Sequence, residues 1–105
     1  MTDNTKKIIE QILAVPKGKV CSYRDIAMKA GLPNGARQTV RTLHTMSEKH
    51  NLPWHRIIRS DGTIGLQGEG RALQMKLLRK EEVKISKEAD RWVAVPVGGL
   101  VLHDS

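Results

Sequence analysis

Two helical stretches joined by a glycine-bearing break constrain the fold of this chain more than any other feature of its sequence. Ser22, with Asp25 three residues later, forms a capping box, which predicts a helix that continues through Ala30. Residues 31–35, Gly-Leu-Pro-Asn-Gly, end that helix, and a second helix is predicted over residues 36–49. Two helices joined in this way form a candidate helix-turn-helix, with the second helix as the recognition helix.

The second helix has one apolar side in its sequence pattern. Val40, Leu43 and Met46 recur at helical spacing, so we expect them to face the core. The charged and titratable side chains of this helix are expected elsewhere on its surface: Arg37, Arg41 and His44. Exposed cations on a recognition helix suit a protein that binds nucleic acid.

The rest of the chain carries weaker signals. The expected elements are a helix over residues 5–15, a short extended segment at 20–21, a strand over 55–59, a hairpin turn at 60–63 before Ile64, a helix over 71–80, and short strands over 83–85 and 92–97. Glycines 65, 68 and 70 predict a flexible connector before the last helix. We expect Leu73, Leu77 and Leu78 to point inward from that helix, and residues 98–105 to form a tail. The predicted fold class is α+β, mainly helical.

The composition predicts one small basic domain. A single hydrophobic core fits 105 residues, so residues 1–105 are expected to form one domain. The formal net charge of +7 is typical of nucleic-acid-binding domains, although other basic proteins share it. Cys21 is the only cysteine and the four histidines show no zinc-ligand spacing, so no disulfide within the chain, metal or cofactor is expected. The single cysteine and the absence of a membrane-length apolar segment favour a cytoplasmic protein.

The segment Pro53-Trp54-His55-Arg56-Ile57 has the surroundings of a nucleophile motif without the nucleophile. It resembles the Pro-Cys-His-Arg-Val active-site segment of the O6-alkylguanine-DNA alkyltransferases, with Trp54 in place of the alkyl-accepting cysteine. An indole offers an N–H donor and a flat aromatic surface, but not the deprotonated sulfur that alkyl transfer needs. The chain therefore resembles the alkyltransferase-like proteins, a DNA-binding family related to those repair enzymes.

Three further motifs and one glutamate fall in the same register, and the resemblance covers about residues 5–83. They are Gly18 to Tyr23, similar to the family's GxVxSY; Gly35 to Val40, similar to AARAVG; Ser60 to Gly65, the strand and turn after the active site; and Glu81, at the place of the active-site glutamate. The chain departs from the pattern at Arg41, where a glycine is usual, and at residues 67–70, where the enzymes have Tyr-Ser-Gly-Gly. The alkyltransferases usually carry an extra N-terminal domain, for which this length leaves no room.

The resemblance implies a role for each matched residue. Arg37 would be the finger that fills the space left by an extruded nucleotide, and Tyr23 would crowd the neighbouring phosphate and turn the nucleotide outward. Trp54 would lie against the extruded guanine. Without the family register, phosphate contact would be the better explanation of Arg37 and a core position the better explanation of Trp54, and Tyr23 could be a half-buried helix residue.

The implied sites extend beyond these three residues. His55 and Glu81 resemble the pair that activates the enzymes' cysteine and here would shape the pocket, while Arg56 would donate hydrogen bonds to loop carbonyls or, less favourably, contact phosphate. The predicted lesion pocket comprises Tyr23, Pro53, Trp54, His55, Ile57 and Gly68, in which residues 53–57 form the pocket segment. The predicted DNA-binding residues are Ser22, Tyr23, Arg24, Ala36, Arg37, Gln38, Arg41 and Ser60.

The leading hypothesis is a damage sensor without enzymatic activity. As a winged helix-turn-helix domain like the C-terminal domain of the alkyltransferases, the chain would bind double-stranded DNA as a monomer and flip O6-alkylguanine out of the helix. The resemblance further implies a handoff to nucleotide excision repair proteins. Two alternatives remain: an active alkyltransferase with another nucleophile, for which Cys21 is the one thiol, and a regulator that reads the major groove.

Overall fold

The computed structural model describes residues 2–95 of the chain. The elements, in order, are α1 (Asp3–Leu13), β1 (Cys21–Ser22), α2 (Tyr23–Lys29), α3 (Ala36–His50), the 3-10 helix η1 (Trp54–Arg56), β2 (Ile57–Ile58), α4 (Gly68–Lys80), β3 (Lys84–Glu88) and β4 (Arg91–Val95). The fold is mixed α and β, as expected, with four α-helices among the described residues. No helix of residues 2–95 is long and apolar enough to cross a membrane. The predicted tail at 98–105 lies outside the described residues.

Local capping explains where the first helices begin. The Thr2 side chain accepts a hydrogen bond from the Thr5 backbone N–H at 3.1 Å, and Ser22 Oγ accepts from the Asp25 N–H at 3.0 Å. The predicted helix start at Ser22 is therefore confirmed. At its other end, α3 stops at Asn51, which takes the left-handed conformation that commonly ends helices.

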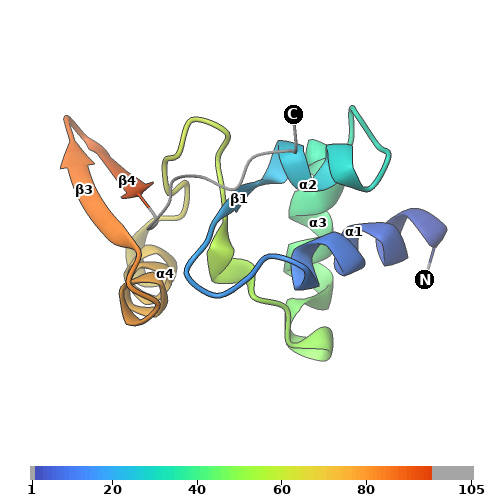
Figure 1. Cartoon of the computed structure of the whole chain (residues 1–105), viewed down its shortest axis with the longest axis horizontal. Helices are drawn as coiled ribbons and strands as arrows, with labels where there is room; N and C mark the ends of the chain where they lie inside the picture. The colour runs from blue at the N-terminus through green and yellow to red at the C-terminus, as the bar shows by residue number, and fades with distance from the viewer. Residues whose placement is uncertain (1, 96–105) are drawn as a thin grey trace.

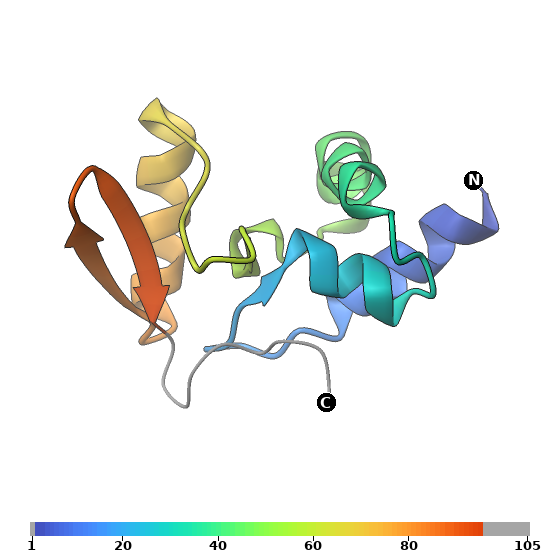
Figure 2. The same ribbon diagram turned by 90° about the horizontal axis from the view of Figure 1, so that it is seen from above.

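The first three helices and the β-hairpin occupy opposite ends of the molecule (Figures 1 and 2). Helices α1, α2 and α3 lie at one end, α4 and the β3–β4 hairpin lie at the other, and β1 lies between them. β1 pairs in parallel with β2, with Cys21 opposite Ile57 and Ser22 opposite Ile58. Two segments that are far apart in sequence therefore meet at the centre of the molecule.

This central pair divides the core into two clusters. Cys21 and Ile57 pack with the apolar residues of α1 and α2, whereas Val20 and Ile58 pack with those of α4 and the hairpin. Successive side chains of an extended strand point to opposite faces, so one short pair of strands supplies both clusters. The β1–β2 pair thereby fixes the three-helix end against the hairpin end.

The structure corrects the segment after residue 54. His55 and Arg56 lie in the 3-10 helix η1, and only Ile57 and Ile58 form a strand. Residues 60–63 do turn the chain, since Arg59 N–H donates to the Thr63 carbonyl at 3.1 Å, but the turn does not join a hairpin. Strand β2, which leads into the turn, pairs with β1, and Thr63, at the end of the turn, pairs with Val93 of β4. Non-local pairing has taken the place of the predicted local one.

The last helix begins earlier than predicted and turns a different face inward. Gly68 and Gly70 belong to α4 instead of a flexible connector, because the helix starts at Gly68. Leu78 is buried as expected, but Leu73 is 48% exposed and Leu77 is half-buried. The buried residues of α4 are Gln74, Met75 and Leu78. β3 continues to Glu88, beyond the predicted end at 85.

In α3 the predicted apolar side is displaced. Val40 is 38% exposed, while Thr39 and Thr42 are buried, and Leu43 and Met46 are partly buried against the core. The Thr39 hydroxyl donates to the Gly35 carbonyl at 3.2 Å, and this bond satisfies its polar group inside the protein. Small buried threonines let α3 approach its neighbours closely, and Val40 is left facing a cavity.

Candidate nucleic-acid interface

A cavity of about 260 Å³ opens beside Trp54. Side chains from α2, α3, η1, α4 and the loop before α4 form its walls. Its lining residues are Tyr23, Val40, Leu43, His44, Ser47, Trp54, Leu66 and Gln74. Sites for small organic groups usually have this form, with mostly apolar walls and a few polar groups. The cavity lies just below the volume of about 300 Å³ at which known ligand pockets begin.

Two residues of the predicted lesion pocket, Tyr23 and Trp54, line this cavity. The other predicted members do not. His55 turns toward Glu81, Ile57 is buried in the core, and Gly68 is the exposed first residue of α4. A 3-10 helix has three residues per turn, so consecutive side chains of η1 point in three different directions. The Trp54 and His55 rings accordingly meet edge-on, with 86° between their planes.

Pro53, the remaining predicted member, sits immediately before η1. It is half-buried and is not among the residues that line the cavity.

Six lining residues were not predicted from the sequence. They are Val40, Leu43, His44, Ser47, Leu66 and Gln74. The first four share one face of α3, since spacings of three, four and seven residues bring side chains together on a helix. The sequence pattern predicts a core face of Val40, Leu43 and Met46 with His44 elsewhere, whereas the structure places Val40, Leu43 and His44 together at the cavity. Leu66 and Gln74 carry no comparable local signal.

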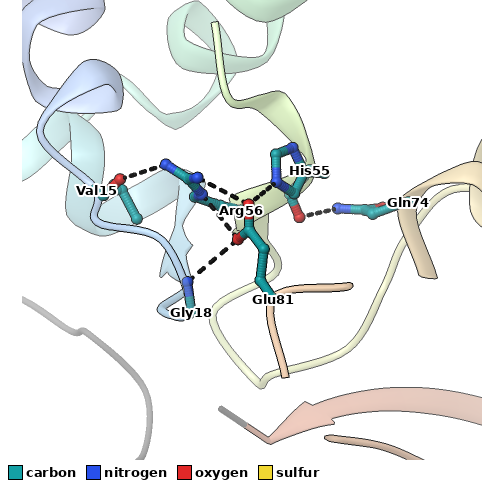
Figure 3. A network of polar contacts seen from close by, with 6 residues as sticks. All are labelled: Val15, Gly18, His55, Arg56, Gln74 and Glu81. Carbon is teal, nitrogen blue, oxygen red and sulfur yellow. Dashed lines mark hydrogen bonds and ion pairs between the residues drawn. The ribbon is translucent and has the colours of Figure 1, made fainter. Parts of the chain in front are cut away.

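Glu81 is the centre of a polar network that includes His55 and Arg56, the two residues after Trp54 (Figure 3). Its Oε2 lies 2.9 Å from Nε2 of His55 and 2.8 Å from Nη2 of Arg56. Its Oε1 accepts hydrogen bonds from Nε of Arg56 at 3.0 Å and from the backbone N–H of Gly18 at 3.2 Å. Nη1 of Arg56 donates to the carbonyl of Val15 at 2.9 Å. A two-point Arg–carboxylate pair of this kind fixes both side chains in one geometry.

This network connects three separate parts of the chain. Glu81 caps the end of α4, Arg56 belongs to η1, and Gly18 lies in the loop between α1 and β1. Gly18 has a φ of +84°, and a Cβ atom there would stand 3.3 Å from the Glu81 carbonyl oxygen, so a glycine suits this close approach. Arg56 donates to a loop carbonyl, as expected, but its main partner is Glu81.

The electrostatics of Glu81 follow from this geometry. Burial alone would raise its pKa, but the hydrogen bonds from Arg56, His55 and Gly18 outweigh burial and lower the pKa from 4.5 to about 2. The carboxylate is thus charged at any physiological pH. Its oxygens are engaged by groups of the protein itself.

Gln74 holds η1 from the side of α4. Its Nε2 donates to the carbonyls of His55 at 3.0 Å and Ile57 at 3.2 Å, and its side chain also lines the cavity. Trp54 is therefore carried on a segment that is fixed from two directions, by Glu81 and by Gln74.

The predicted DNA-binding residues fall into two groups and one exception. Tyr23, Arg24, Ala36 and Ser60 line a second cavity of about 290 Å³ together with Arg59 and Asp61. The other predicted residues of α3 line a third cavity, of about 450 Å³, between α3 and the N-terminal end of α1. They are Arg37, Gln38 and Arg41. Ser22 is 2% exposed and its hydroxyl caps α2, which does not fit a contact with DNA.

Cys21 is poorly placed to act as a nucleophile. Its side chain is 1% exposed, in the core cluster beside Ile57. Burial raises the pKa of its thiol to about 11, so the thiol is protonated at neutral pH.

Known proteins are similar to this chain in sequence and in fold. The family model described as the 6-O-methylguanine DNA methyltransferase DNA-binding domain matches residues 3–83. Alkyltransferase-like protein 1 of Schizosaccharomyces pombe is 35% identical over 81 residues, which cover 75% of each chain. This chain is an alkyltransferase-like member of that family. The DNA base-flipping protein of Escherichia coli K12 is 37% identical over 81 residues; these cover 77% of this alkyltransferase-like protein but 63% of the relative's length.

The solved structures extend the likeness to three dimensions. The crystal structure of Schizosaccharomyces pombe Atl1 in complex with damaged DNA containing O6-carboxymethylguanine superposes with a TM-score of 0.79. The two sequences are 29% identical, and the match covers 93% of both chains. The alkyltransferase-like protein described here thus shares its fold with a chain that binds damaged DNA.

Proposed function

We propose that this alkyltransferase-like protein recognises O6-alkylguanine in double-stranded DNA by flipping the damaged nucleotide into the cavity beside Trp54. The observation that carries the proposal is the indole at the wall of an open, mostly apolar cavity whose lining residues include no cysteine. Stacking of a base on an aromatic side chain contributes about 1–3 kcal/mol, which favours capture of a base whose pairing is already weakened. Two similar proteins support this assignment: one is named a DNA base-flipping protein, and the other was solved in complex with damaged DNA.

In this proposal the protein binds the lesion without repairing it. Alkyl transfer needs a thiolate at the substrate carbon, and the protonated, buried thiol of Cys21 does not supply one. The His55–Glu81 contact, which would activate a cysteine in the enzymes, here orders the segment that carries Trp54. A cavity that imposes no geometry for attack on an alkyl carbon would accept bulky O6 substituents as well as methyl.

The DNA would be held by α2 and α3 acting as a winged helix-turn-helix in the minor groove, with residues 1–105 as a single DNA-binding module. Arg37, exposed near the start of α3, would enter the duplex and fill the space left by the extruded nucleotide. Tyr23, Arg24 and Ser60 would meet the backbone of the damaged strand. We propose that the protein acts as a cytoplasmic monomer and presents the distorted DNA to nucleotide excision repair proteins.

A titration of matched duplexes with and without one O6-methylguanine tests the proposal. We expect the wild-type chain to prefer the damaged duplex, and Arg37→Ala and Tyr23→Ala each to narrow that preference. Lys49→Ala, which removes an exposed cation at the end of α3, is the control and should leave the preference unchanged. Equal affinity of the wild-type chain for both duplexes would favour a sequence-reading regulator instead. A stoichiometric gain of about 14 mass units after incubation with the damaged duplex would indicate alkyl transfer.

A further inference from the structure

Arg59 follows directly after β2 and lines a cavity next to the Trp54 cavity. Its backbone is held in the turn: its N–H donates to Thr63 at 3.1 Å, and its carbonyl accepts from Gly62 at 2.9 Å. Its side chain is exposed and lines the 290 Å³ cavity with Tyr23, Arg24 and Ser60. Tyr23 lines the Trp54 cavity as well, so the two cavities adjoin at one phenol.

Gly65 determines where the guanidinium group of Arg59 lies. A Cβ atom on Gly65 would stand 2.7 Å from Nε, 3.2 Å from Cζ and 3.4 Å from Nη2 of Arg59. The guanidinium therefore rests directly on the backbone at residue 65, where only the absence of a side chain leaves room. This contact orders a long side chain that would otherwise lose entropy on binding a ligand.

The guanidinium carries no ion pair among residues 2–95. The nearest carboxylate along the chain, Asp61, is already engaged: its Oδ1 accepts from the N–H and hydroxyl of Thr63 at 3.0 and 2.6 Å, and its Oδ2 lies 3.4 Å from Nη1 of Arg91. The hydrogen bonds from Thr63 lower the pKa of Asp61, and Arg59 helps to lower it by electrostatic attraction, but the Arg59 guanidinium makes no direct contact with that carboxylate. An arginine whose N–H groups are not taken up by a carboxylate, in a cavity with two hydroxyl groups and a second arginine, has the donors that a phosphate group accepts.

We propose that Arg59, held against Gly65, binds a backbone phosphate that flanks the extruded nucleotide on the damaged strand. This inference rests on the proposed function, because the phosphate reaches the rim beside Tyr23 only when its nucleotide has turned into the Trp54 cavity. Ser60 and Tyr23 offer their hydroxyls to the same phosphate, and Arg24 adds a second positive charge. The site thus binds a phosphodiester in the rotated backbone and stabilises the extruded state.

The test combines protein variants with DNA in which one backbone phosphate is replaced by an uncharged methylphosphonate. Wild-type and Arg59→Ala chains are titrated with O6-methylguanine duplexes that carry a methylphosphonate immediately 5′ or immediately 3′ of the lesion. We expect Arg59→Ala to weaken binding of the unmodified lesion duplex about tenfold, and of the undamaged duplex less than threefold. One of the two methylphosphonates should weaken the wild-type chain by a similar factor but have less than a twofold effect on Arg59→Ala. Arg79→Ala, which removes an exposed cation from the last turn of α4, is the matched control.

Gly65→Ala tests the same site without removing a charge. The new methyl group displaces the flexible end of Arg59, so we expect binding of the lesion duplex to weaken at least threefold while the melting temperature changes little. In the Arg59→Ala background the same substitution should have no further effect. Gly70→Ala is the control glycine, because a Cβ atom there would meet Leu66 at an ordinary 3.6 Å.

The outcomes separate this inference from the function on which it rests. A wild-type lesion preference with fully additive effects of Arg59→Ala and both methylphosphonates would overturn the role of Arg59 and leave the proposed function standing. Equal binding of damaged and undamaged duplexes by the wild-type chain would contradict both.

Discussion

Trp54 stands in a segment whose neighbours hold their positions through polar contacts with the rest of the protein. His55 and Arg56 are both engaged by Glu81, so the direction of the indole is set by contacts that do not involve the indole itself. The backbone at residue 54 can therefore keep the same shape whether it carries a tryptophan or a cysteine. At this scale, binding without reaction requires only that the reactive sulfur be absent from the cavity.

Replacing Trp54 with leucine should reduce the preference for damaged DNA. The loss of the aromatic surface removes about 1–3 kcal/mol of stacking, so we expect affinity for an O6-methylguanine duplex to fall about tenfold or more in fluorescence anisotropy. Trp92→Leu is the control, because Trp92 packs against the hairpin-end core and does not line the Trp54 cavity. It should lower thermal stability without narrowing the preference.

Glu81→Gln should destabilise the fold in a pH-dependent manner. The folded pKa of Glu81 is about 2 and its ordinary value is 4.5, so its stabilising effect is complete above about pH 5 and is lost as the pH falls toward 2. We expect the variant to lose on the order of 2 kcal/mol in urea unfolding at pH 7, and the difference from wild type to shrink at pH 3. Glu82→Gln, an exposed neighbour, is the control. A constant difference across this range would contradict the assigned role of the carboxylate.

At the scale of the elements, α4 does more than cover the core. Through Gln74 it holds the backbone of η1, and through the cap at Glu81 it holds the side chains of the same segment. The pocket segment is therefore positioned by a helix that follows it in sequence, across the loop of residues 59–67.

Gln74→Leu tests this connection. The substitution leaves the carbonyls of His55 and Ile57 without their donor inside the protein, so we expect a loss of about 2 kcal/mol in the free energy of unfolding. Relative to wild type, hydrogen exchange should become faster in η1, whose carbonyl groups Gln74 binds, and should change less in α1, whose buried residues pack in the other core cluster. Unchanged exchange in η1 would show that the Glu81 network alone holds that segment.

Local signals in the sequence predict the local parts of this fold. The capping box at Ser22 predicts the start of α2, and the glycine-bearing break predicts the separation of α2 from α3. The parallel pairing of Cys21 with Ile57 is non-local and only two residues long, so no periodicity announces it. The start of α4 at Gly68 runs against the low helix propensity of glycine, and Gly68 itself has a φ of +61°, which glycine adopts without strain.

The sequence likewise predicts only part of the candidate site. The family resemblance brings Tyr23 and Trp54 to one place, and the structure puts both at one cavity. The resemblance did not reveal the face of α3 that includes Val40 and Ser47, because their spacing is equally typical of a core face. The position of Arg59 depends on the backbone at Gly65, a contact that only the folded chain makes visible.

For the whole molecule, net charge and shape set how the DNA is approached. The chain carries a net charge of +7 on a body of about 37 × 31 × 23 Å. We expect affinity for both damaged and undamaged duplexes to fall steeply between 50 and 200 mM salt, because bound phosphates release their counterions. The ratio of the two affinities should change by no more than about fourfold, since one additional phosphate contact distinguishes them. Equal affinities for the damaged and undamaged duplexes at 200 mM salt would indicate that charge alone accounts for the preference.

The most direct measurement is a crystal structure of the chain bound to a duplex that contains one O6-methylguanine. The account predicts that the damaged base lies outside the helix against Trp54, with its methyl group still on O6, and that Arg37 fills the space it has left. A base still stacked in the duplex and remote from Trp54, or a methyl group transferred to the protein, would contradict the account.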